Sequence, residues 1–196
     1  MAHKHYKLFK PYGYISQISS NDERQLRKKK FLKDIETIPK DVMPIGRLDE
    51  KSEGLLLLTT DGKLSNTVNT SGIEKEYYVL VDGAITHDQV QKLREGVSIG
   101  LNGKKYITKP CQVTLLETSP ELPDRGKKIR DERHGPTTWL SIIITEGKFR
   151  QIRKMTSAVG TPTLRLVRVR IGNILLKNLL PGEVIAIEKD NISSNF

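Results

Sequence analysis

The hydrophobic residues of this chain fall into short blocks separated by charged stretches. The most apolar block, GLLLLTT at residues 54–60, is continuous rather than alternating, which is typical of a strand buried on both faces. KEYYVLVDG at residues 75–83 is rich in aromatic and β-branched residues and predicts another strand. Similar blocks predict further strands within residues 6–17, 107–117, 139–147, 164–172 and 183–190.

A helix is predicted at residues 86–97, THDQVQKLREGV. Thr86 can cap its first turn, and Gly96 ends it. Val90 and Leu93 lie on one face. A second helix is predicted at residues 148–160, where apolar and small side chains recur on one side: Phe149, Ile152, Thr156 and Val159. We therefore expect the second helix to lie on a sheet with Phe149 and Ile152 pointing inward.

The order of these elements mixes hairpins with isolated helices, which favours an α+β fold with a mostly antiparallel sheet. The length of 196 residues suits one domain, 1–196, folded as two lobes. The charged segment 21–41 is expected to be a loop or a short helix. The segment 118–138, with five basic and four acidic residues, is expected to be a long loop, and loops of this length are functional or disordered.

Charge points to a polyanionic partner. The net charge is +10, and the excess is concentrated, since Arg24–Lys33 holds six basic residues and Gly147–Arg170 holds seven, with no acid in either. In the second stretch, Arg150, Arg153 and Lys154 have the i, i+3, i+4 spacing that places side chains on one flank of a helix. The alternative is an ordinary solvated basic face.

Other classes are disfavoured. The single cysteine, Cys111, excludes a disulfide within the chain, and the scattered histidines show no metal-ligand spacing. The aliphatic runs are far shorter than the roughly 20 residues of a membrane span. Residues 1–13 do not read as a signal peptide. We expect a cytoplasmic protein that binds no metal and no membrane.

The stretch PIGRLDEKSEGLLLLTTDG, residues 44–62, carries the candidate chemistry. Arg47 and Asp49 are two residues apart, so in an extended segment they share a side while Leu48 turns to the core. A carboxylate mounted ahead of a rigid strand is a plausible nucleophile. Two alternatives stay open: Asp49 is a structural acid, or it binds magnesium together with other acids, namely Glu50, Glu53 and Asp61.

Three motifs in this order resemble the pseudouridine synthases that modify ribosomal RNA: GRLDEKSEGLLLLTTDG (46–62), KEYYV (75–79) and EGKFRQIRKM (146–155). VGTPTLRLVRVRIG follows the third motif. KPYGYISQ near the start and PTTWL (136–140) extend the resemblance over nearly the whole chain, most closely to the large-subunit synthase E subgroup. Several relatives add a small N-terminal RNA-binding domain, and because the first strand is predicted to begin at about Tyr6, we expect no such domain in this chain.

The resemblance implies a fold of two lobes with a mixed sheet, flanking helices and a central catalytic cleft. It implies conversion of uridine to pseudouridine in ribosomal RNA without any cofactor. Asp49 matches the catalytic aspartate, Tyr77 the tyrosine that can stack on the target base, and Arg153 the basic residue that pairs with the aspartate. Tyr78, on the opposite face of the strand, is then expected to be the core aromatic.

The resemblance also implies a set of RNA contacts. Arg47 matches the arginine that supports the flipped nucleotide. The further candidates for contacts to the RNA are Lys75, Arg150, Lys154, Arg165 and Arg168. We expect a monomer with large-subunit ribosomal RNA as its partner and no obligate protein partner. The alternative function is a non-catalytic, RNA-binding ribosome-assembly factor.

Overall fold

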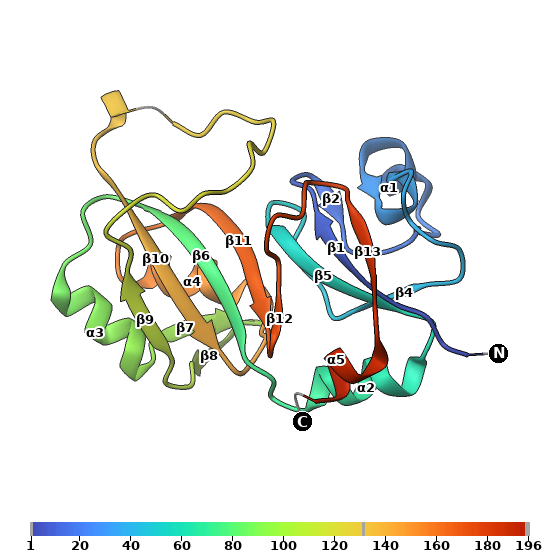
Figure 1. Cartoon of the computed structure of the whole chain (residues 1–196). Coiled ribbons are helices and arrows are strands. Elements are labelled where there is room, and N and C mark those ends of the chain that lie inside the picture. Colours follow the sequence, from blue (N-terminus) through green and yellow to red (C-terminus); the bar gives the residue numbers. More distant parts are fainter. Residues whose placement is uncertain (1, 131, 195–196) are drawn as a thin grey trace. The chain divides into compact units, whose positions relative to one another are not determined.

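The computed structural model describes residues 2–130 and 132–194 (Figure 1). Its chain divides into two compact units. Unit 1 consists of Met1–Ile73, Pro123–Lys127 and Arg168–Phe196, and unit 2 of Glu74–Leu122 and Lys128–Val167. The expectation of one catalytic domain without a separate RNA-binding domain stays a prediction.

The described residues form five α-helices: α1 (Glu23–Lys28), α2 (Gly62–Thr70), α3 (His87–Glu95), α4 (Gln151–Ala158) and α5 (Lys189–Ser193). Two short 3-10 turns are at Leu32–Asp34 and Glu132–His134. The strands are β1 (His5–Lys10), β2 (Tyr14–Ile15), β3 (Lys30–Phe31), β4 (Met43–Ile45), β5 (Glu53–Thr59), β6 (Lys75–Asp82), β7 (Ser98–Leu101), β8 (Lys104–Ile107), β9 (Gln112–Leu115), β10 (Thr137–Ile144), β11 (Thr163–Ile171), β12 (Ile174–Leu175) and β13 (Val184–Ile187). The predicted α+β class with a mostly antiparallel sheet is confirmed. Among the described residues, no helix combines the length and apolarity needed to cross a membrane.

The sheet of unit 1 is built around β5. Strand β1 pairs antiparallel with β5 on one side and with β13 on the other, in a register that sets Lys10 opposite Gly54. Strand β4 also pairs antiparallel with β5. All seven residues of β5 are buried, as the continuous apolar run predicted.

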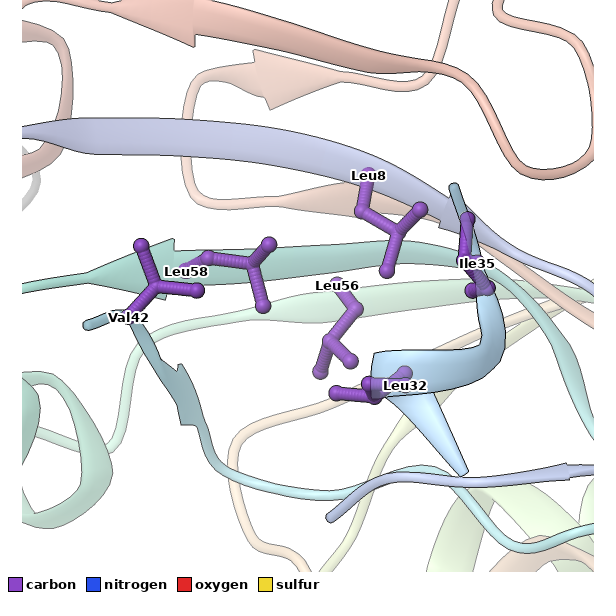
Figure 2. Packing of buried hydrophobic residues seen from close by; sticks show 6 residues of the cluster. All are labelled: Leu8, Leu32, Ile35, Val42, Leu56 and Leu58. Carbon is purple, nitrogen blue, oxygen red and sulfur yellow. The ribbon is translucent and has the colours of Figure 1, made fainter. Parts of the chain in front are cut away.

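Leucines from β1 and β5 form the core on one face of this sheet. Leu8, Leu56 and Leu58 pack against the 3-10 turn and the chain that follows it (Figure 2). The other members of the cluster are Leu32, Ile35 and Val42. The charged segment 21–41 therefore closes the core of unit 1 with its few apolar residues while α1 stays outside, since none of its residues is buried.

Unit 2 contains the antiparallel strand order β6-β10-β9, with Tyr77 opposite Ile142. Helix α3 is capped as predicted, because Thr86 Oγ1 accepts a hydrogen bond from the backbone N–H of Gln89, and Gly96 ends the helix. The hairpin of β7 and β8 was not predicted. It turns at Asn102–Gly103, where both residues have positive φ.

The prediction that Phe149 points inward is wrong. Helix α4 begins at Gln151, and Arg150 precedes it in the left-handed conformation, with φ of 53°. Gln151 is buried and fixes this start, because its Oε1 accepts from the N–H of Lys148 and its Nε2 donates to Glu146. Starting the helix there leaves Phe149 in the preceding loop, 70% exposed.

Candidate active site

Asp49 lies in the connection between β4 and β5. Its side chain is half-buried, and its carbonyl accepts a hydrogen bond from the N–H of Ser52 at 3.0 Å, which closes a tight turn directly before the strand. Gly46 enters the connection with φ of 69°, a conformation that glycine adopts without strain. A short connection into a fully buried strand gives the carboxylate a rigid mount.

Ser16 fixes the residue before Asp49 from both sides. Its buried hydroxyl donates to the carbonyl of Leu48 at 2.9 Å and accepts from the N–H of the same residue at 3.0 Å. Leu48 is buried, as the spacing predicted, and Arg47 is exposed. The backbone on either side of Asp49 is therefore held by named hydrogen bonds.

Replacing Ser16 by alanine should loosen this turn. The variant leaves a buried N–H and a buried carbonyl of Leu48 unpaired, so we expect about 1–3 kcal/mol less stability in urea unfolding. We also expect a lower kcat with little change in KM, because Asp49 loses its fixed orientation. Ser19→Ala, at an exposed serine of the same segment, is the matched control. Unchanged kcat in Ser16→Ala, with the stability loss present, would show that the clamp has no role in placing Asp49.

Lys10 is a buried lysine beside this turn that sequence reasoning missed. Its ammonium donates to the carbonyls of Pro11 at 2.8 Å and Tyr14 at 2.6 Å, and the side chain is 0% exposed. Burial lowers the pKa of Lys10 to about 7, against the opposing attraction of nearby carboxylates. Those carboxylates belong to Glu53, Asp49 and Glu50, and Arg168 lowers the pKa further. The alternation of side chains along the strand could have revealed the burial of Lys10, because it places this residue on the same face as the core residue Leu8.

The turn after Lys10 is tied to the Asp49 turn. The N–H of Gly13 donates to the carbonyl of Glu50 at 2.8 Å, and the Glu50 carboxylate pairs with Lys29 at 2.7 Å. Glu50 therefore has a structural role in joining these two turns and in pairing with Lys29.

The magnesium alternative finds no support in unit 1. Asp61 caps α2, where its Oδ1 accepts from the backbone N–H groups of Lys63 and Leu64. These hydrogen bonds lower the pKa of Asp61, mainly through Leu64. Within residues 2–130 and 132–194, no group of three or more metal-binding side chains comes together.

Unit 2 holds the other two residues matched to catalytic roles. Tyr77 is buried on β6, and Tyr78 is half-exposed, so the assignment of Tyr78 as the core aromatic of the pair is wrong. The side chains alternate as predicted, but the more enclosed face is that of Tyr77. Arg153 is half-buried on α4, where its Nη1 lies 3.5 Å from the carbonyl of Thr163. Lys75 begins β6 opposite Ile144 and is half-exposed.

The basic residues assigned to RNA contacts differ in exposure. Arg165 and Arg168 are buried on β11, and Arg168 Nε donates to the carbonyl of Leu55 at 2.7 Å. This placement does not favour phosphate contacts for the pair, and it gives Arg168 a part in holding β5. Arg150 and Lys154 are half-exposed at the start of α4.

The structure thus places the predicted residues in two sets. Arg47 and Asp49 lie together in unit 1 with Lys10, while Tyr77 and Arg153 lie in unit 2. The meeting of Asp49 with Arg153, 104 residues later in the sequence, stays a prediction, as does the catalytic cleft.

Known proteins place this chain in a family. Residues 5–158 match the family described as RNA pseudouridylate synthase. "Ribosomal large subunit pseudouridine synthase E" of Xanthomonas axonopodis pv. citri is 44% identical over 181 residues, which are 91% of each chain. The enzyme with the same name from Vibrio vulnificus is 43% identical over 89% of this chain and 70% of its own length. A solved structure, "Crystal structure of pseudouridylate synthase", has a TM-score of 0.75 and 26% identity, covering all of this chain and 74% of that one.

The chain belongs to the RNA pseudouridylate synthase family. It is an RNA pseudouridine synthase, an isomerase, and the resemblance carried by its three motifs is confirmed. The match over residues 5–158 includes the Asp49 turn, β6 and the start of α4, so the geometry described above is that of a synthase of this family.

Proposed function

We propose that this protein isomerises a specific uridine to pseudouridine in large-subunit ribosomal RNA, with Asp49 as the catalytic carboxylate. The observation that carries the proposal is the match to two synthases named for the large ribosomal subunit over about nine-tenths of this chain. The rigidly mounted Asp49 turn of unit 1 supports the assignment of the carboxylate.

The remaining roles follow from the same family match. A base in a duplex is out of reach of a side chain, so the target uridine is turned out of the helix at a cost of roughly a few kcal/mol. Arg47, exposed next to Asp49, supports the flipped nucleotide, and Tyr77 stacks on the uracil. Arg153 pairs with the Asp49 carboxylate. The base leaves and returns within one active site, so the reaction needs no external group donor and no cofactor.

Basic residues of unit 2 attract the RNA. Lys75, Arg150 and Lys154 are half-exposed and contact phosphates of the RNA. The affinity for RNA should therefore fall steeply as the salt concentration rises. Arg165 and Arg168 are buried, and Arg168 helps to hold β5 through its hydrogen bond to the carbonyl of Leu55. We further propose that the enzyme works as a monomer in the cytoplasm, which light scattering and cell fractionation test directly.

Mapping pseudouridines tests the proposal in cells. In ribosomal RNA from a strain that lacks this gene, we expect one pseudouridine of the large subunit to be missing, and we expect the gene to restore it. With purified protein and an RNA transcript that contains the site, conversion should proceed in the presence of a chelator. Tight RNA binding with every uridine unchanged would instead favour a non-catalytic assembly factor, and loss of activity with the chelator would revive a metal-dependent reaction.

A further inference from the structure

Phe149 is an aromatic residue held in an exposed loop of unit 2. Its side chain is 70% exposed, and the loop that carries it is fixed by the hydrogen bonds of buried Gln151 to Lys148 and Glu146. The left-handed Arg150 follows it directly. The exposed ring is therefore the product of an ordered loop, not of a frayed end.

Two lysines of this region make cation–π contacts, one of them with the Phe149 ring itself. The ammonium of Lys154 lies 5.2 Å from the centroid of the Phe149 ring and donates to the carbonyl of Gly100 at 2.7 Å. The neighbouring Lys148 places its ammonium 5.1 Å from the centroid of the Tyr106 ring. The β7–β8 hairpin thus holds both lysines near the loop.

The single acid near the loop, the half-buried Glu146, is occupied by hydrogen bonds. Glu146 is the one acid between residues 145 and 160. Its carboxylate accepts hydrogen bonds from the Tyr106 hydroxyl, the N–H of Lys109 and Gln151 Nε2. Burial alone would raise the pKa of Glu146, but these bonds and the charge of Lys148 outweigh it, so that the pKa is lowered.

An exposed aromatic ring among fixed cations has the chemistry of a site for unpaired nucleic acid, because a base stacks on the ring while phosphates meet the ammonium groups. We propose that Phe149, with Lys148, Arg150 and Lys154, is a stacking platform for one unpaired nucleotide of the RNA substrate, other than the target uridine assigned to Tyr77. The proposal rests on the proposed function for the identity of the RNA. It adds a specificity-determining contact to those already assigned to Asp49, Tyr77 and Arg153.

Substitutions at Phe149 test the platform through RNA affinity. The probe is a large-subunit ribosomal RNA transcript that contains the target site, and its Kd is measured by filter binding at fixed salt. We expect Phe149→Ala to raise Kd about tenfold and KM similarly, with kcat little changed. Phe149→Tyr keeps the aromatic face and should bind like the wild type. Phe149→Leu keeps the apolar surface without that face and should bind like Phe149→Ala.

Two further variants distinguish base stacking from electrostatic attraction and from nonspecific hydrophobic binding. Ile107→Ala removes another apolar side chain of unit 2, 65% exposed, and should leave Kd unchanged. Lys154→Gln should weaken binding and reduce the slope of log Kd against log salt by about one, whereas Phe149→Ala should weaken binding with the slope unchanged.

The outcomes decide the inference independently of catalysis, because Kd is measured apart from conversion. If the wild type binds the transcript but converts no uridine, the proposed function fails, and the Phe149 comparison still stands. If Phe149→Ala binds the transcript as tightly as the wild type, the platform does not exist. Equal binding by Phe149→Leu and the wild type would also overturn it, since an apolar contact rather than a stacked base would then explain the exposed ring.

Discussion

Replacing Asp49 by asparagine should abolish pseudouridine formation while RNA binding is retained. The amide has nearly the same shape as the carboxylate, so the turn closed by the N–H of Ser52 and the buried Leu48 should persist. An amide is neither a nucleophile nor a base at neutral pH, so the rate should fall by at least about a thousandfold. Nucleoside analysis of the transcript by mass spectrometry measures the conversion, and filter binding measures the affinity.

Asp41→Asn is the matched control for this variant. Asp41 is an exposed aspartate of the same unit with φ of 63°, a left-handed conformation that asparagine also tolerates. It should convert the transcript at the wild-type rate. Substantial turnover by Asp49→Asn would refute the role assigned to the carboxylate, and loss of RNA binding in the same variant would show that Asp49 acts in recognition instead.

Local signals in the sequence were sufficient for most of the backbone. The continuous apolar run of β5 and the cap and stop residues of α3 act within a few positions, and both elements form where expected. The hairpin of β7 and β8 was missed, because each strand is only four residues long and its turn depends on Asn102–Gly103. Such a hairpin is specified by turn chemistry rather than by hydrophobic periodicity.

The candidate site was less accessible from the sequence, since it depends on which side chains are enclosed. Periodicity placed Phe149 on the buried face of a helix, but the hydrogen bonds of Gln151 start α4 later and leave the ring outside. Its charge led us to predict that Arg168 contacts phosphate. The side chain is instead buried and donates a hydrogen bond to the backbone carbonyl of Leu55 in β5. Lysine is almost never fully buried, so nothing in composition alone marked Lys10.

Lys10 should give the protein a stability that rises with pH across neutrality. Burial lowers the pKa of Lys10 from 10.5 to about 7, so between these values the unfolded chain holds a proton that the folded chain has released. Stability therefore increases with pH in this window, and it is least below pH 7, where folding must bury the charged ammonium. From pH 6 to pH 8.5 the contribution is about 2 kcal/mol.

Urea unfolding of the wild type and of Lys10→Met over this pH range measures the effect. Methionine cannot take up a proton, so the stability of Lys10→Met should rise with pH by about 2 kcal/mol less than that of the wild type. This difference in pH dependence does not depend on how much stability the variant loses with the bonds to Pro11 and Tyr14. Lys4→Met, at an exposed lysine before β1, should keep the wild-type slope. Burial raises the pKa of Cys111 to about 11, so above pH 9 this thiol makes the stability fall as the pH rises. Measurements below pH 8.5 avoid this opposing effect. Equal slopes in the wild type and Lys10→Met would contradict a lowered pKa for Lys10.

The same measurement tests whether Lys10 is coupled to Asp49. The Asp49 carboxylate is one of the charges that raise the pKa of Lys10 against the effect of burial. Removing that charge in Asp49→Asn should therefore lower the pKa of Lys10 further and move the rise in stability to lower pH. A rise at the same pH in Asp49→Asn and the wild type would mean that Lys10 and the catalytic turn are electrostatically independent. A shift to lower pH would show that the buried ammonium acts directly on the Asp49 carboxylate, to which we assign the catalytic role.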